Sequence, residues 1–490
     1  MTKAKYYFLL PALPIAAFLA GTIFLQTNKT PWVDECYTYY GITHDSWDGF
    51  FDSICSGVNF SPPLYFLLNW IVQLVFHIPI GALRIESALW ISLGMFLIFI
   101  RCAKSFGGLS AFLGCTVVLL QSKLLFEQAL EARHYGMFFA TGAWLILLFP
   151  ENQRFNSKKH NALYFLAHLT LSLTHYLGIV FSALTGIARF WFQRKKGVKE
   201  SLPITEISSS IVALPIYIVL LSQQSSHLGN WVKPNTLTSL LETSFSSLTL
   251  LTLVIPILLS LFFIKSRKKP NATVSLPPIV IIAIIWFLTP IIFWIISHVS
   301  SLNLFKDRYF IPKEAAVMVL VSYFLHRVIP MLGKSKSPLS SKLLSVGVTL
   351  LVCISMFLLS AKRTLFGFEP NKDYHHKLLI KEEICRSPLT KIYSGDHLFF
   401  PNYYTNTSYT NHTLVVSNEG IKEVYNRFNS IIDTITLNEF SKEPFVLILD
   451  VNNYFINDIS IKRNYFMEDI ILPLSNPIKA YKMTPVKDVP

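Results

Sequence analysis

Two adjacent carboxylates, Asp34 and Glu35, follow the first long apolar run of the chain, in the stretch TPWVDECYTYYG at 30–41. A carboxylate within hydrogen-bond reach of a hydroxyl can act as a general base. Ionised groups this close to a membrane boundary must be hydrated, be paired with an opposite charge or take part in catalysis, because an unpaired charge in hydrocarbon is costly. Which of these applies depends on what the chain places beside them.

Three later stretches combine charged and aromatic residues: EQALEARHYG at 127–136, THYLG at 174–178 and FKDRYFIP at 305–312. Their cations can hold an anionic headgroup, since the planar guanidinium of arginine binds two phosphate oxygens at once. Their acids, with Asp34 and Glu35, can deprotonate a neutral acceptor. Each residue alone also has a structural explanation, as a side chain that reaches water from a helix end or as part of an interfacial aromatic belt.

The composition predicts a membrane protein. Of the 490 residues, 52% are hydrophobic and only 15% are charged. Apolar runs such as 8–25 and 279–296 recur, and about 20 such residues span a bilayer core of roughly 30 Å. The net charge of +14 comes from basic clusters between these runs, which the positive-inside rule places in the cytoplasm. This placement argues against a nucleic-acid surface, and the fold class is a polytopic α-helical membrane protein.

The basic clusters also predict the topology. Lys3 and Lys5 place the N-terminus inside, so 26–83 is the first exported loop. Within it, 62–79 lies along the interface rather than crossing, which keeps Arg101 and Lys104 in the cytoplasm. The chain then has about 11 transmembrane helices, at 8–25, 84–101, 108–125, 136–150, two short spans within 161–193, 204–222, 239–264, 276–297, 311–330 and 343–361.

The transmembrane domain is expected over 1–365, and the composition changes after it. Residues 366–490 are polar, with alternating stretches such as TLVVS and PFVLILDV, which are typical of strands. We expect a small exported α/β domain there. Cys36 and Cys55 fall in the first exported loop and could form a disulfide, and unpaired thiols are equally compatible with the sequence.

The motifs resemble, in order, those of a known family. WVDE, SPPLYFLL followed by LRIESAL, EQALEARHYG, THYLG and DRYFIP resemble the motifs of polytopic glycosyltransferases of the GT-C fold. The nearest group is the dolichyl-phosphate-mannose protein mannosyltransferase family with its bacterial relatives, including lipid A aminoarabinose transferases. The resemblance covers about residues 5–330. Many relatives carry a histidine before the paired prolines where this chain has Ser61, so that histidine's role does not carry over.

The resemblance implies roles for individual residues. It implies a catalytic aspartate at Asp34, with Glu35 beside it, and a polyprenyl-phosphate-linked sugar as donor. By analogy, the residues that contact the donor phosphate or sugar are Arg133, Tyr135, His175, Tyr176, Lys306, Arg308 and Tyr309. Structural or acceptor contacts are expected from Ser61, Arg84, Glu131 and His134.

The predicted function is transfer of a sugar to an acceptor on the exported face of a bacterial inner membrane, with Asp34 as general base. The acceptor is a protein, a lipid or a wall glycan. No cofactor and no metal site are predicted, because the acids and histidines lack a compact ligand spacing, although a divalent metal near Asp34 stays an alternative. A lipid-linked glycan flippase or transporter, a lipid-linked glycan ligase or polymerase, and a non-catalytic scaffold are the other candidates.

Overall fold

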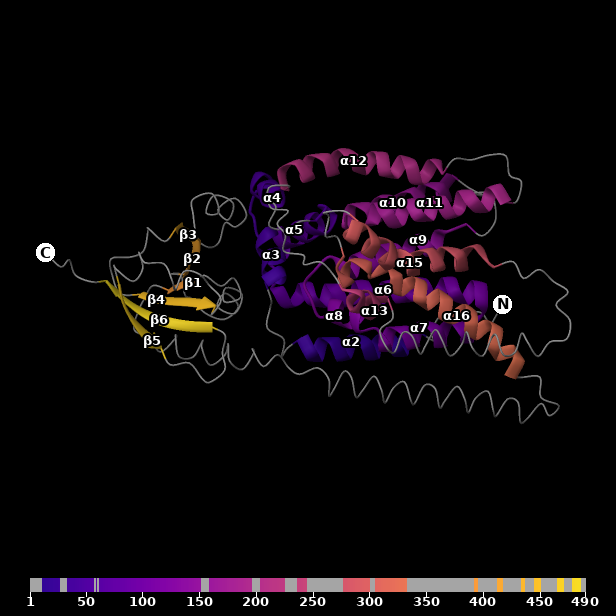
Figure 1. Cartoon of the computed structure of the whole chain (residues 1–490), viewed down its shortest axis with the longest axis horizontal. Helices are drawn as coiled ribbons and strands as arrows, with labels where there is room; N and C mark the ends of the chain where they lie inside the picture. Colours follow the sequence, from indigo (N-terminus) through magenta and orange to yellow (C-terminus); the bar gives the residue numbers. More distant parts are fainter. Residues whose placement is uncertain are drawn as a thin grey trace.

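The computed structural model describes the helical part of the chain and six strands near its carboxyl end. The described residues are 11–26, 33–56, 59, 61–150, 158–195, 203–224, 236–244, 276–299, 305–332, 392–394, 412–416, 433–436, 445–450, 465–470 and 478–485. The helices are α2 (Ala12–Gln26), α3 (Val33–Gly41), α4 (Trp47–Cys55), α5 (Leu64–Phe76), α6 (Ile80–Phe106), α7 (Gly108–Gln121), α8 (Lys123–Ala129), α9 (Tyr135–Leu148), α10 (Lys158–Thr174), α11 (Gly178–Lys195), α12 (Ile204–Gln224), α13 (Leu237–Ser244), α15 (Pro278–Val299), the 3-10 helix η2 (Asp307–Phe310) and α16 (Pro312–Leu332). The long helices form a bundle, with α3 and α4 at one end of it (Figure 1).

Several of these helices can cross a bilayer. Within the described part of the chain, α6, α12 and α15 are long and apolar enough. Helices α7 and α8 together would make a fourth span, bent by 68° at the break between them. Ser122 starts α8 after this bend, because its Oγ accepts a hydrogen bond from the Leu125 N–H at 3.1 Å. The chain is a polytopic helical membrane protein, as its composition predicts.

The helices coincide with the apolar segments of the sequence. The run at 8–25 corresponds to α2, the span at 136–150 to α9, and the two short spans within 161–193 to α10 and α11. The predicted span at 343–361 and most of the one at 239–264 lie outside the described residues. The number of about 11 crossings therefore stays a prediction.

Helix α5 is too short to cross a membrane. Its 13 residues extend about 20 Å, against roughly 30 Å for a hydrocarbon core. It packs on α4, where the Trp70 and Phe50 rings stack at 4.8 Å between centroids, and its Ile71 and Val75 are exposed. A non-crossing α5 is compatible with the predicted interfacial segment at 62–79, and its depth relative to the bilayer stays a prediction.

Close packing of the bundle depends on small residues. Gly114 of α7 lies against α16, and a Cβ at this position would be 2.7 Å from the Ser322 N and 2.9 Å from its Cα. These are backbone atoms, so they cannot turn away as a flexible side chain would. Small residues at membrane helix contacts permit this backbone approach.

Gly114→Ala is therefore expected to destabilise the protein by about 1–3 kcal/mol, the usual cost of overpacking. Thermal unfolding of the purified protein in detergent measures it. Gly21→Ala in α2 is the matched control, because nothing lies within 4 Å of a Cβ there and alanine favours a helix more than glycine does. Equal unfolding temperatures for Gly114→Ala and the wild type would contradict the packing argument.

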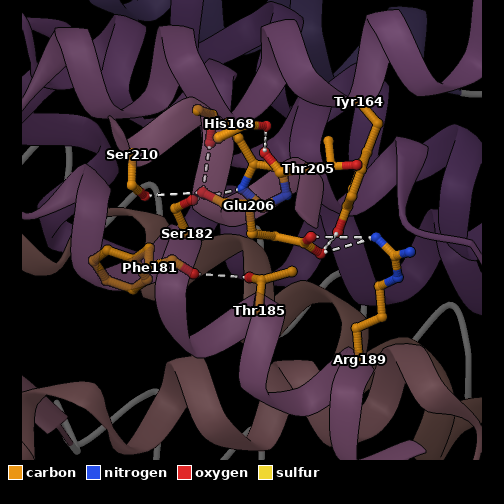
Figure 2. A network of polar contacts seen from close by, with 11 residues as sticks. Tyr164, His168, Phe181, Ser182, Thr185, Arg189, Thr205, Glu206 and Ser210 are labelled. Carbon is orange, nitrogen blue, oxygen red and sulfur yellow. Dashed lines mark hydrogen bonds and ion pairs between the residues drawn. The ribbon is translucent and has the colours of Figure 1, made fainter. Parts of the chain in front are cut away.

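A buried polar network joins α10, α11 and α12 (Figure 2). Arg189 Nη1 lies 3.2 Å from both carboxylate oxygens of Glu206, and the Tyr164 hydroxyl donates to the same carboxylate at 3.1 Å. His168 Nδ1 and Ser182 Oγ lie 2.6 Å apart beside this ion pair. Because the charges are buried but paired, the network fixes the relative positions of the three helices.

The strands of the C-terminal region form one mixed sheet. They are β1 (Ile392–Ser394), β2 (His412–Val416), β3 (Asp433–Thr436), β4 (Phe445–Asp450), β5 (Tyr465–Ile470) and β6 (Ile478–Pro485), in the order β3-β2-β1-β4-β6-β5. The first four are parallel and β6 is antiparallel to both β4 and β5. Strands β2 and β4 match the two predicted from sequence. The predicted domain boundary near 366 lies outside the described residues, and Figure 1 places the sheet beyond the end of the bundle that holds α3 and α4.

Candidate functional site

Helix α3 places Asp34 and Glu35 in its first turn. Consecutive residues of an α-helix point about 100° apart, because one turn takes 3.6 residues. The two acids therefore have different surroundings, although they are neighbours in sequence. Glu35 belongs to a buried ion pair, whereas Asp34 belongs to a partly exposed cluster of charges.

Glu35 forms the buried ion pair. Its side chain is 0% exposed, and its oxygens accept from Arg84 Nε at 2.7 Å and Arg84 Nη2 at 2.9 Å. The backbone N–H of Ala132 donates to the same carboxylate at 2.8 Å, and Arg84 Nη1 donates to the Gln26 carbonyl at 3.3 Å. Glu35 thereby ties α3 to α6 and to the segment before α9, a geometry that suits holding Asp34 in place.

Asp34 belongs to the charge cluster. Its Oδ2 lies 2.9 Å from Arg308 Nη2 and 3.8 Å from Arg133 Nη2, and its side chain is 18% exposed. One carboxylate thus faces two guanidinium groups, so the three side chains together carry excess positive charge. A site with this balance attracts an anion and keeps a carboxylate within reach of it.

Arg133 is fixed by a backbone carbonyl and by the side chains of Thr38 and Asn59, neither of which was predicted as a site residue. Its Nη1 donates to the Asp34 carbonyl at 2.9 Å, to Thr38 Oγ1 at 3.1 Å and to Asn59 Oδ1 at 3.0 Å. Thr38 could have been found from its i+4 spacing to Asp34 on a helix. Asn59 lies in a polar stretch whose fold the sequence does not reveal.

Four aromatic rings surround the cluster. The Tyr135 ring lies 6.0 Å from Arg133 Cζ and 5.7 Å from Arg308 Cζ, within cation–π distance of both. It stacks on Tyr309, with 6.3 Å between centroids. His175 contacts Tyr309 at 5.1 Å and His134 at 5.2 Å. The structure thus brings together residues from α3, α9, η2 and the turn between α10 and α11.

Both histidines of this group are neutral at physiological pH. Burial, and then the charges of Arg133 and Arg308, lower the pKa of His175 to about 3. Burial first, followed by the positive charge of Arg133, lowers the pKa of His134 well below its usual value. Burial raises the pKa of Tyr309, so its hydroxyl stays protonated.

Other residues expected at the site lie nearby or apart from it. Ser61 is buried and its N–H donates to the Asn59 carbonyl at 2.7 Å. Glu131 precedes Arg133 in the same turn, and its backbone carbonyl accepts from the Arg133 N–H at 2.9 Å. Lys306 precedes η2. Tyr176 packs on Tyr217 of α12, with 5.1 Å between ring centroids.

The cysteines and metal candidates can also be placed. Cys36 and Cys55 are both buried, and no disulfide joins them in the structure. Within the described ranges, no group of three or more histidine, cysteine, aspartate or glutamate residues is placed to hold a metal ion. Asp34, Glu35, His134 and His175 therefore do not form a common ligand set there, and metal dependence stays untested.

Comparison with known proteins identifies the fold. No protein-family model matches the sequence, and no curated protein matches it either. The crystal structure of ArnT from Cupriavidus metallidurans bound to undecaprenyl phosphate matches with a TM-score of 0.63, covering 96% of this chain and 97% of that one at 12% identity. The chain has the fold of ArnT.

The structure of ArnT in the apo state gives the same result, with a TM-score of 0.58, 13% identity and 98% of both chains covered. ArnT is a lipid A aminoarabinose transferase of the GT-C fold. The resemblance to GT-C enzymes inferred from the ordered motifs is thus confirmed at the level of the fold. It extends past residue 330, where the motif resemblance ends, because the match to ArnT covers nearly the whole chain.

Proposed function

We propose that the chain is a membrane glycosyltransferase, which moves a sugar from a polyprenyl-phosphate-linked donor to an acceptor on the exported face of the membrane. The observation that carries the proposal is the contact of Asp34 with Arg308 and Arg133 in a protein with the fold of ArnT. ArnT itself binds undecaprenyl phosphate. A carboxylate beside two guanidinium groups supplies a base and an anion-binding surface together.

The proposed reaction is a single displacement at the anomeric carbon. Asp34 accepts the proton of the acceptor hydroxyl as its oxygen bonds to the sugar. The bond from the sugar to the phosphate oxygen breaks, and the polyprenyl phosphate leaves with the electron pair. Arg133 and Arg308 stabilise the charge that develops on the phosphate, an effect that usually makes the largest contribution to such catalysis.

The basic clusters support the proposed location. They place the loop with Asp34 outside the membrane, and the sheet lies beyond the same end of the bundle (Figure 1). An exported active site would face an acceptor outside the cytoplasm, which suits a bacterial inner membrane. The C-terminal sheet would then be exported as well.

The direct test uses the purified full chain in nanodiscs with undecaprenyl-phosphate-linked sugars and candidate acceptors. The lipid-linked sugar and the acceptor are both supplied on the same side of the membrane. Release of undecaprenyl phosphate together with a mass gain of the acceptor would support the proposal. Movement of the lipid-linked sugar between leaflets without breaking the sugar–phosphate bond would instead identify a flippase. That outcome would overturn the transferase proposal.

Arg308→Lys tests the phosphate contact. Lysine keeps the positive charge but lacks the planar fork that binds two oxygens. We expect KM for the lipid-linked donor to rise about tenfold, the value of one hydrogen bond to a charged group. Arg327→Lys is the control, because Arg327 lies on α16, about 25 Å along the helix from the end of η2. If KM for the lipid-linked donor is the same in both variants and in the wild type, Arg308 does not contribute to donor binding.

A further inference from the structure

His175 has one ring nitrogen fixed by the backbone. The backbone N–H of Leu177 donates to His175 Nδ1 at 3.0 Å. A backbone amide is always the donor, so Nδ1 carries a lone pair and no proton. The neutral ring therefore holds its proton on Nε2, and the turn between α10 and α11 selects this tautomer.

The orientation of the ring is fixed as well. Phe138 stacks against it with 4.7 Å between centroids and 16° between planes. Tyr309 packs on it at 5.1 Å, and the Gly178 N–H donates to the His175 carbonyl at 2.7 Å. The imidazole thus has neither a free rotation nor a free choice of tautomer.

Among the residues that the structure describes, none accepts a hydrogen bond from His175 Nε2, and the residue keeps 7% of its surface exposed. Nε2 is not one of the buried polar atoms without a partner, so this donor is accessible to a ligand. The ring lies beside Tyr135 and Tyr309, whose neighbours include Arg308 and Arg133. This is the surface on which the proposed function places the donor phosphate.

We infer that His175 is a neutral hydrogen-bond donor to a phosphate oxygen of the lipid-linked substrate, with Nε2–H presented by the Leu177 contact. The inference rests on the proposed function, which supplies the phosphate. A neutral donor beside two arginines adds a directed contact to the anion without further charge repulsion. The proton stays on Nε2, so His175 acts in binding and takes no part in proton transfer.

Two substitutions separate this role from a structural one. In His175→Asn the amide oxygen can still accept from the Leu177 N–H, but no donor replaces Nε2–H. In His175→Gln the longer side chain places an amide N–H near the position of Nε2, while the Leu177 contact is lost. The two variants therefore each remove one function of the same ring.

The experiment measures binding of undecaprenyl phosphate to the full chain in detergent by calorimetry, together with thermal unfolding. We expect His175→Asn to unfold near the wild-type temperature but to bind about tenfold or more weakly. His175→Gln should unfold at a lower temperature and keep most of the affinity. Wild-type affinity in His175→Asn, or equal losses of affinity in both variants, would overturn the inference while leaving the proposed function intact. Failure of the wild type to bind undecaprenyl phosphate would overturn both.

Discussion

Asp34→Asn is expected to lower kcat for sugar transfer by about a hundredfold to ten-thousandfold, the usual contribution of a general base. Asparagine has nearly the same shape as aspartate but cannot take a proton from the acceptor hydroxyl. The fold should be retained, because Arg133 Nη1 and the Thr38 hydroxyl both bind the Asp34 backbone carbonyl, which the substitution leaves in place. Release of undecaprenyl phosphate by purified protein measures the effect.

The matched control for this loss is Asp45→Asn. Asp45 is an exposed carboxylate in the same loop region, just before α4, and its removal changes the net charge by the same amount. We expect turnover close to that of the wild type. Wild-type turnover in Asp34→Asn itself would exclude Asp34 as the base and leave the cluster as an anion-binding surface only.

Glu35→Gln is expected to destabilise the protein by about 3–5 kcal/mol, the usual cost of breaking a buried ion pair. Arg84, which is 3% exposed, would lose the Glu35 carboxylate that neutralises it, while the Ala132 N–H could still donate to the amide oxygen. Thermal unfolding in detergent should show a lower midpoint. Turnover per folded molecule should fall less than in Asp34→Asn, because Glu35 is buried away from solvent.

A second substitution makes this prediction specific. In Glu35→Gln with Arg84→Met the uncompensated charge is gone, and most of the lost stability should return, since apolar replacements of buried ion pairs are often neutral. The coupling between the two sites follows from the double-mutant cycle. Glu127→Gln is the control, because Glu127 pairs with Lys123 where the side chains are 38% and 64% exposed, and such pairs contribute about 0–1 kcal/mol. Additive losses in the cycle would show that the two residues act independently.

The helices could be predicted from sequence because hydrophobicity is a local property. The run at 8–25 becomes α2 and the apolar segment at 136–150 becomes α9, since each contains its own signal. Helix α6 begins at Ile80, four residues before the predicted span at 84–101. Pro79, in an extended conformation, is the residue just before the helix, and such helix starts are set by packing as well as by composition.

The different roles of Asp34, in the charge cluster, and Glu35, in the buried ion pair, could not be predicted from the sequence. The letters DE are compatible with two bases, two structural acids or one of each. The outcome depends on the direction of each side chain from α3, and so on Arg84 and Arg308, which lie far away in sequence. The stretch 30–41 shows no clear helical pattern of its own, and α3 is held by contacts with residues that only the folded chain brings near.

The hydrogen bonds of Glu35 also constrain how the protein is made. Arg84 follows Glu35 by 49 residues, and the Ala132 amide follows it by 97. At about 5–20 residues per second, translation takes roughly 2–10 s to supply the arginine and about twice as long to supply the amide. During that interval the carboxylate must stay hydrated, either outside the lipid or inside the insertion machinery. The first loop can therefore pack against the bundle only after α6 has been synthesised. The N-terminal third of the chain thus reaches its final packing late in its own synthesis.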